Sequence, residues 1–259
     1  MSETSETPLK SWLERDGALL RLRLARPKAN LIDASMIAAL SQAFERHRGA
    51  PGLRGALLDA EGQHFSFGAS VEEHLPQQCA QMLASLHALV RAMIDWPVPI
   101  LVAIRGQCLG GGLEVAMAGS LLFAAPDARL GQPEIRLGVF APAASVLLPM
   151  RVSQAVAEDL LFSGRSIDGA EALAAGLVSA ISEDPSAHAL EWFDTHLADK
   201  SASSLAMAVR AVRAPYRAQA ALRIAEVERL YLAELMATHD ANEGLNAFIA
   251  RKPPQWAHR

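Results

Sequence analysis

The sequence predicts an α/β fold whose strands lie in the first two-thirds of the chain and whose C-terminal end is helical. Short, continuous apolar runs, such as GALLD at residues 55–59 and ILVAI at 100–104, are typical of buried strands. Segments with the apolar spacing of amphipathic helices separate these runs. Residues 201–248 are alanine-rich and carry apolar stripes at helical spacing. We therefore expect a core at residues 1–195 that holds the functional site, followed by a helical region at 196–259.

The composition is that of a globular protein with a sizeable core. The chain has 259 residues, of which 51% are hydrophobic, enough for one large α/β domain or one domain with a helical annex. The formal net charge is −4, and the sequence has no long run of one sign. A broad basic face for nucleic acid is therefore not expected.

The sequence also has the features of a reduced, cytoplasmic protein. Cys79 and Cys108 have neither metal-ligand nor disulfide-framework spacing. Residues 1–12 are polar and lack a signal-peptide pattern. The apolar run at 99–118 is interrupted by charged residues and glycines, so we expect no membrane span. The histidines form no ligand spacing with nearby carboxylates, and we expect no metal site.

The first half of the chain predicts strands and helices in alternation. After a loose start, ALLRLRLA at 18–25 alternates apolar and basic residues and predicts a half-exposed strand. Residues 33–47 have helical spacing, with Asp33 as the N-cap. The run at 55–59 is a buried strand, and residues 77–94 form an amphipathic helix.

The second half predicts short strands and then helices. A buried strand at 100–104 leads through a glycine-rich turn into a helix at 113–119. Residues 121–124 and 129–131 are strand-like. From residue 149 onward the pattern is mainly helical, with two or three long helices between residues 201 and 248.

The glycine-rich turn, RGQCLGGGLE at residues 105–114, is the strongest local signal. Consecutive glycines between a strand and a helix let the backbone approach a ligand closely, and the helix N-terminus offers free N–H groups. The turn lacks the spacing of a phosphate-binding loop, and a simple tight junction has the same pattern. Glu114 follows in an apolar helical turn, where desolvation raises its pKa and the helix N-terminus lowers it. A carboxyl group balanced in this way suits proton exchange, although a residue that only favours the helix dipole looks alike.

A second carboxylate follows another turn. Pro133 suits the first turn of a helix, and Glu134 is followed by apolar residues. Two carboxylates in apolar settings on separate elements suit general acid–base chemistry on one substrate. Their spacing alone does not predict that Glu114 and Glu134 converge.

Three motifs in order along the chain resemble the crotonase, or enoyl-CoA hydratase/isomerase, superfamily. They are HFSFGAS, then GQCLGGGLEVAMAGSLLFAAPDARLGQPEIRLG, then FSGRSIDGAEALAAGLVS. The similarity runs over roughly residues 12–256. It implies a crotonase (ClpP-like) spiral of ββα units with a C-terminal helical region that mediates assembly into a homotrimer or homohexamer. It also implies an acyl-CoA thioester as substrate and no separate cofactor, because coenzyme A is part of the substrate.

The resemblance assigns roles to particular residues. The N–H groups of Ala69 and Gly111 match the two oxyanion-hole donors that stabilise an enolate. Glu114 and Glu134 match the two glutamates that hold water and exchange protons in hydratases.

Three further residues belong to the expected substrate-binding set. Gly68 and Gly110 directly precede the two oxyanion donors. Lys28 lies in the segment that matches the contact with the adenosine end of coenzyme A.

Departures from the family pattern narrow the expected substrate. Ser70 replaces the aspartate that commonly follows the oxyanion alanine, and FAPAAS at 140–145 replaces a glycine-rich segment. With these departures the sequence most resembles members that hydrate a cyclic, conjugated dienoyl-CoA in anaerobic benzoyl-CoA degradation. The hydroxyl then adds to the carbon β to the thioester and the proton to the far end of the diene. A flat ring needs an apolar slot, and the candidates to line it are Phe65, Phe67, Phe140 and Leu147. For each of them taken singly, a plain core position is the more common interpretation.

Two other functions remain open from the sequence. One is a general short-chain enoyl-CoA hydratase or isomerase, which the bulk of residues 140–145 disfavours. The other is a non-catalytic protein that binds a CoA thioester or RNA, which the two retained glutamates and the acidic net charge disfavour. We expect a hydro-lyase.

Overall fold

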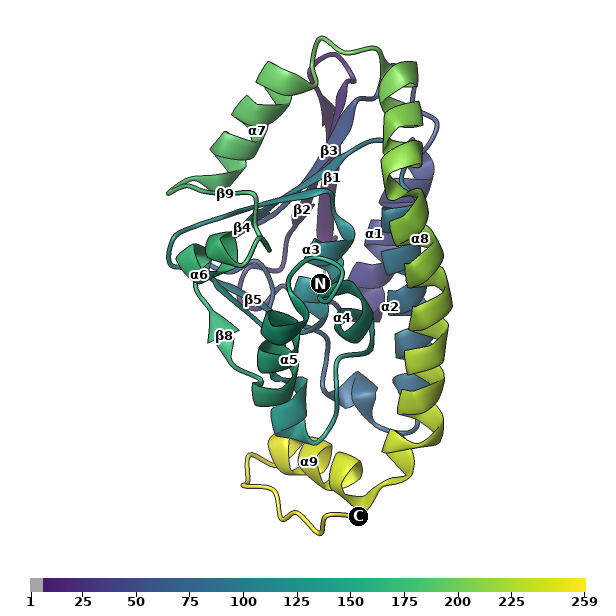
Figure 1. The fold of residues 1–259 in the computed structure, drawn as a ribbon, viewed down its shortest axis with the longest axis vertical. Helices are drawn as coiled ribbons and strands as arrows, with labels where there is room; N and C mark the ends of the chain where they lie inside the picture. The colour runs from purple at the N-terminus through teal and green to yellow at the C-terminus, as the bar shows by residue number, and fades with distance from the viewer. Residues whose placement is uncertain (1–6) are drawn as a thin grey trace, which may run out of the picture.

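The strands form two sheets. The computed structural model describes residues 7–259 (Figure 1). Its strands are β1 (Leu9–Glu14), β2 (Leu19–Leu24), β3 (Gly55–Ala60), β4 (Ile100–Ile104), β5 (Gln107–Leu109), β6 (Leu121–Ala124), β7 (Arg129–Gly131), β8 (Ser166–Ile167) and β9 (Ala180–Ile181). Six of them form one sheet in the order β1-β2-β3-β4-β6-β9, and the other three form a small sheet in the order β5-β7-β8.

Helices surround these sheets. The α-helices are α1 (Ala34–His47), α2 (Cys79–Ile94), α3 (Gly111–Ala118), α4 (Pro142–Leu147), α5 (Gln154–Ser163), α6 (Gly169–Ala174), α7 (Pro185–His196), α8 (Ala202–Ala233) and α9 (His239–Ile249). Short 3-10 helices are η1 (Glu72–His74), η2 (Pro133–Leu137) and η3 (Leu235–Ala237). Mixed strands and helices with a helical C-terminal region confirm the predicted fold class.

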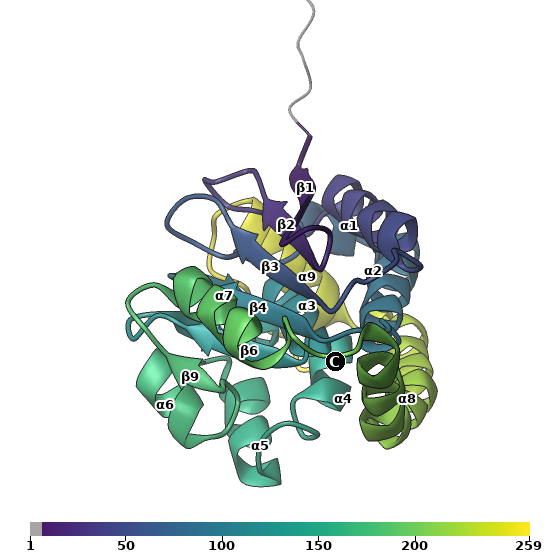
Figure 2. The same ribbon diagram turned by 90° about the horizontal axis from the view of Figure 1, so that it is seen from above.

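The register of the large sheet explains why its strands are continuous apolar runs. Strands β2, β3, β4 and β6 are parallel to one another. One row of side chains across them consists of Leu22, Leu58, Val102 and Leu122. This row belongs to the main core, on the side of α1, α2 and α3. The adjacent row faces α7 and packs against Phe193. Figure 2 shows α7 on one side of the sheet and α1, α2 and α8 on the other. Both faces are therefore buried, as is usual for parallel sheets.

The N-terminal strands differ from the prediction in two ways. Residues 9–14, expected to be loose, form β1, which pairs antiparallel with β2; residues 1–6 of that expected loose start lie outside the described part. The strand predicted as half-exposed is almost wholly buried, and Arg21 is only 4% exposed. Asp59 accounts for this, because it lies 2.7 Å from the guanidinium groups of both Arg21 and Arg23. A paired charge tolerates burial that an unpaired one does not.

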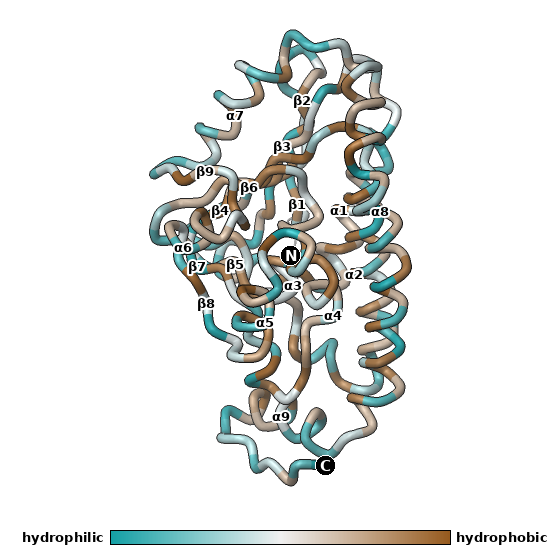
Figure 3. The backbone as a smooth tube through the Cα atoms, in the orientation of Figure 1, coloured by the Kyte–Doolittle hydropathy of each residue, from teal (hydrophilic) through white to brown (hydrophobic). Residues whose placement is uncertain are grey.

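The predicted helix starts and buried strands are largely confirmed. Asp33 caps α1 by accepting a hydrogen bond from the N–H of Met36 at 3.0 Å. Strands β4 and β6 have the predicted bounds, whereas the short strands β5, β8 and β9 were not predicted. Figure 3 shows the hydrophobic residues concentrated along the central strands and alternating with hydrophilic ones along α8.

The C-terminal helices are part of the main core. Ala220, Ile224 and Tyr231 form the buried stripe of α8, which packs against α2 and α4. Arg213 of α8 donates to the carbonyls of Ala118 and Gly119 at 2.9 and 2.8 Å, at the C-terminus of α3. A cation at this helix end is favourable because the dipole is negative there.

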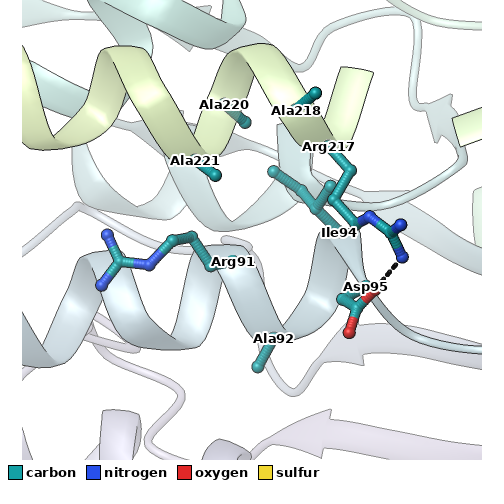
Figure 4. A pocket seen from close by; sticks show the side chains of 8 residues that line it. All are labelled: Arg91, Ala92, Ile94, Asp95, Arg217, Ala218, Ala220 and Ala221. Atoms are coloured by element: carbon teal, nitrogen blue, oxygen red, sulfur yellow. Dashed lines mark hydrogen bonds and ion pairs between the residues drawn. The ribbon is translucent and has the colours of Figure 1, made fainter. Parts of the chain in front are cut away.

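A pocket of about 450 Å³ lies between the solvent-facing turns of α2 and α8. Alanines of α8 and an ion pair between Arg217 and Asp95 at 2.7 Å line it (Figure 4). None of the carboxylates or glycines of the predicted site lines this pocket. Over residues 7–259 no helix combines the length and hydrophobicity needed to cross a bilayer.

Candidate active site

The small sheet brings the two predicted carboxylates together. Strands β5 and β7 are parallel, with Leu109 opposite Gly131, and the N–H of Gly110 donates to the carbonyl of Gly131 at 3.0 Å. Parallel strands end at the same edge of a sheet. The segment after β5 begins α3 with Glu114, and the segment after β7 begins η2 with Glu134. The pairing of these two short strands therefore brings Glu114 and Glu134 to the same edge of the small sheet, which the sequence spacing alone did not predict.

Residues 65–69 run alongside β5, and this brings Ala69 to the start of α3. Ser66 forms a parallel bridge with Cys108, and its carbonyl accepts from the N–H of Leu109 at 3.0 Å. Gly68 then turns the chain with a φ of +102°, a conformation that favours glycine. A Cβ placed on Gly111 would lie 3.2 Å from the nitrogen of Ala69, so the two backbone nitrogens are neighbours.

The N–H groups of Ala69 and Gly111 are available for an acceptor that enters the site. Within residues 7–259 neither donates a hydrogen bond to a protein group. Gly111 is the first residue of α3, where N–H groups have no intrahelical partner and the helix dipole is positive. The pair can therefore stabilise an oxygen on which negative charge develops.

Glu114 is buried at the first turn of α3. Its side chain is 3% exposed, and Oε1 accepts from the N–H of Ala144 in α4 at 2.8 Å. Burial raises the pKa of Glu114 to about 7, although the N–H groups of Ala144 and Ala143 act in the opposite direction. Residues 140–145 thus do more than replace flexible glycine, because the start of α4 within them holds this carboxylate.

Glu134 lies beside the glycine turn. A Cβ placed on Gly110 would overlap Oε1 of Glu134, so the carboxylate rests directly on this glycine. Burial, and then the charge of Glu114, raise the pKa of Glu134 to about 8. The two carboxyl groups therefore act on each other, and at a pH between these two pKa values the pair holds about one proton. Such a pair can take a proton from one atom and give a proton to another.

Gln132 is a site residue that the sequence interpretation missed. It is 1% exposed, and its amide faces the Glu134 carboxylate. With the amide nitrogen directed toward Glu134, it donates to both oxygens at 3.1 and 3.2 Å. The available signal was a polar residue held between Gly131 and Pro133, next to a proposed catalytic acid.

Lys28 lies at a separate pocket. Residues 26–31 line a pocket of about 360 Å³. This segment is joined to residues 65–69, because the N–H of Phe67 donates to the carbonyl of Ala29 and the N–H of Ile32 to that of Gly68, both at 2.9 Å.

The residues predicted to line a ring slot differ in burial: two lie in the main core and two are partly exposed. Phe65 and Leu147 are fully buried members of the main core. Phe67 is 42% exposed and packs edge-on against His64. Phe140 is half-buried, and its ring lies edge-on to Tyr231 with centroids 5.3 Å apart.

In residues 7–259 no group of three or more His, Cys, Asp or Glu side chains is arranged to hold a metal ion. The chemistry of the site as described rests on two carboxyl groups, backbone N–H donors and one buried amide.

The chain belongs to the enoyl-CoA hydratase/isomerase family, whose model matches residues 14–259. A cyclohexa-1,5-dienecarbonyl-CoA hydratase from Thauera aromatica is 68% identical over 259 residues, covering 100% of both chains. A carnitinyl-CoA dehydratase from Proteus mirabilis is 32% identical, covering 94% of this chain and 96% of that one.

The fold is shared with solved structures of the family. A crystal structure of an enoyl-CoA hydratase/isomerase from Pseudoalteromonas atlantica is 28% identical, with a TM-score of 0.84 over 96% of this chain and 100% of that one. An enoyl-CoA hydratase from Bacillus halodurans has a TM-score of 0.86 at 18% identity, over 93% of this chain and 99% of that one. The predicted crotonase fold and family are confirmed.

Proposed function

We propose that this protein is a hydro-lyase that adds water to cyclohexa-1,5-diene-1-carbonyl-CoA and forms 6-hydroxycyclohex-1-ene-1-carbonyl-CoA, a step of anaerobic benzoyl-CoA degradation. The observation that carries the proposal is the pair of mutually interacting carboxyls, Glu114 and Glu134, beside the free N–H groups of Ala69 and Gly111. The substrate is supported by 68% identity along the full length of a hydratase named for this compound.

The first role of the site is to stabilise charge on the thioester. The thioester oxygen accepts hydrogen bonds from Ala69 and Gly111, and it gains negative charge when a nucleophile adds to the conjugated system. Each such donor contributes about 3 kcal/mol to lowering the barrier. Gly68 and Gly110 are needed because their positive φ values place these donors side by side.

The second role is proton transfer by the carboxylate pair. The ionised member takes a proton from water, and the resulting hydroxide oxygen bonds to the ring carbon β to the thioester. The electron pair of that double bond moves toward the thioester and forms a dienolate. The protonated member then gives its proton to the far end of the diene, which re-forms the conjugated enoyl thioester. One water is consumed, and the pair ends with the protonation states exchanged.

Several further features complete the proposal. Lys28 contacts the adenosine end of coenzyme A, and Phe65, Phe67 and Phe140 shape the acyl site. No separate cofactor takes part. The protein acts in the cytoplasm as a homotrimer or homohexamer, with residues 196–259 forming the assembly region.

The activity is tested with two substrates and two variants. Purified protein is assayed with the cyclic dienoyl-CoA and with crotonyl-CoA, and products are identified by mass spectrometry. We expect preference for the cyclic diene, and a loss of about a hundredfold or more in each of the variants Glu114→Gln and Glu134→Gln. Preference for crotonyl-CoA would instead indicate a general enoyl-CoA hydratase. Absence of any hydrated product would indicate a protein that only binds CoA thioesters.

A further inference from the structure

Tyr231 carries a buried hydroxyl that the roles described above do not use. The residue lies on the inner stripe of α8, is 0% exposed, and its hydroxyl has no hydrogen-bond partner in the structure. Buried polar groups almost always have a partner, and leaving one without a partner is costly. A molecule that enters the region could therefore supply this partner.

The neighbours of Tyr231 place its ring beside the elements that carry and hold the two glutamates. Its ring packs edge-on against Phe140, which lies on the short connection between η2, carrying Glu134, and α4, which holds Glu114. Helix α8 packs directly on α4 and α2, as Figure 1 also shows.

The electrostatic environment agrees with this placement. Burial raises the pKa of Tyr231, and the nearby Cys79, Glu134 and Glu114 raise it further. The hydroxyl thus lies within range of both carboxylates and stays protonated throughout the working pH range. It is therefore a hydrogen-bond donor in the neighbourhood of an ionisable pair.

The chemistry of the proposed substrate identifies the partner, and this step rests on the proposed function. The ring of the cyclic diene has no polar atom, and its thioester oxygen is held by Ala69 and Gly111. The remaining polar atom in the reaction is the oxygen of the added water, which becomes the ring hydroxyl. We infer that the Tyr231 hydroxyl donates a hydrogen bond to this oxygen, as water before the addition and as the ring hydroxyl in the product. Tyr231 is then a specificity residue for the hydroxylated end of the acyl group.

The test uses Tyr231→Phe, which removes one oxygen and keeps the ring that packs on Phe140. Kinetics are measured with the cyclic dienoyl-CoA. Inhibition constants are taken from initial rates for two compounds, the hydroxylated product and cyclohexane-1-carbonyl-CoA, which has no hydroxyl. We expect kcat/KM and product affinity each to fall about tenfold, the size of one lost hydrogen bond. Affinity for the unhydroxylated compound and the Tm should not fall.

Tyr216→Phe is the matched control. Tyr216 lies on the same helix, and its hydroxyl donates to the carbonyl of Met117 at 3.3 Å, at the opposite end of α3 from the glycine turn. Its removal should leave both inhibition constants unchanged.

Two results for Tyr231→Phe would overturn the inference while the wild type remains active. One is an unchanged kcat/KM together with unchanged inhibition constants. The other is an equal loss of affinity for both compounds with a lower Tm, which indicates a packing role. If the wild type does not hydrate the cyclic diene, the proposed function fails, and the inference falls with it.

Discussion

Gly110 lies between the carboxylate of Glu134 and the backbone of Gly68. Replacing it with alanine tests the placement of Glu134. The backbone at this position has a φ of +49° and a ψ of −128°, a combination that essentially only glycine adopts. An added Cβ would also overlap Oε1 of Glu134. The substitution therefore has two effects, one on the backbone and one on the carboxylate.

The size of each effect follows from the geometry. Forcing alanine into this backbone conformation costs about 1–3 kcal/mol, and for a chain of this length each kcal/mol lowers the Tm by roughly 2–4 °C. To restore an ordinary C···O contact of about 3.4 Å, the carboxylate must move on the order of 1 Å. A displacement of that size reduces catalysis by about a hundredfold, which corresponds to about 2.7 kcal/mol of barrier.

Gly176→Ala is the matched control for the backbone effect. Gly176 has a φ of +77°, and an added Cβ there would meet no atom within 4 Å. We expect both variants to lose stability in thermal unfolding, but only Gly110→Ala to lose kcat/KM with the cyclic dienoyl-CoA. If Gly110→Ala keeps wild-type kcat/KM, the carboxylate of Glu134 does not act from the position described. Equal losses of activity in both variants would show that backbone strain alone explains the result.

Three further predictions concern pH, the buried amide and the buried ion pair. The pKa values of Glu114 and Glu134 are raised from 4.5 to about 7 and about 8 in the folded protein. The folded state binds more protons than the unfolded state in this interval, so the free energy of unfolding should fall as pH rises from about 4.5 to about 8. When both residues are replaced by glutamine, the dependence of Tm on pH across this window should largely disappear. An unchanged dependence would contradict the raised pKa values of the two glutamates. Replacing Gln132 with leucine removes a donor to Glu134, so its pKa should rise and the pH–rate profile should move to higher pH, whereas an unmoved profile would mean that the amide does not contact the carboxylate. Replacing Asp59 with alanine removes the carboxylate that Arg21 and Arg23 share and leaves Arg21 only its pair with Glu14 at 3.1 Å, so it should cost about 3 kcal/mol in urea unfolding. Removing Asp194, which pairs with an arginine at the surface, should cost about 1 kcal/mol or less. Similar values for the two would refute the burial argument.

The sequence was most informative where one local pattern decides the structure. Strands β4 and β6 are buried on both faces, so they are continuous apolar runs, and their bounds could be predicted. The cap of α1 could be predicted because Asp33 and its acceptor role are local. The burial of Arg21 could not, because its partner Asp59 lies on another strand and nothing near Arg21 indicates the pair.

The site shows the same division. The glycine turn and the two glutamates stood out as motifs, and the family resemblance gave them expected roles. Their proximity depends on the three-residue strands β5 and β7, which are too short for any periodicity to identify. The position of Tyr231 on an apolar stripe is visible in the sequence, but the absence of a partner for its hydroxyl exists only in the folded chain.

The support of Glu134 has a consequence for how the protein matures. Its 3-10 helix, η2, rests on α9 and the segment after it: a Cβ on Gly244 would overlap the carbonyl of Leu137, and one on Gly138 would lie 3.0 Å from the ring of Trp256. During synthesis Glu134 is made more than a hundred residues before α9, against which the C-terminal end of its 3-10 helix packs. A ribosome-bound chain that exposes the glycine turn and both glutamates still lacks this surface. The proposed active site therefore gains this support only after residues 239–256 have left the ribosome and packed against η2.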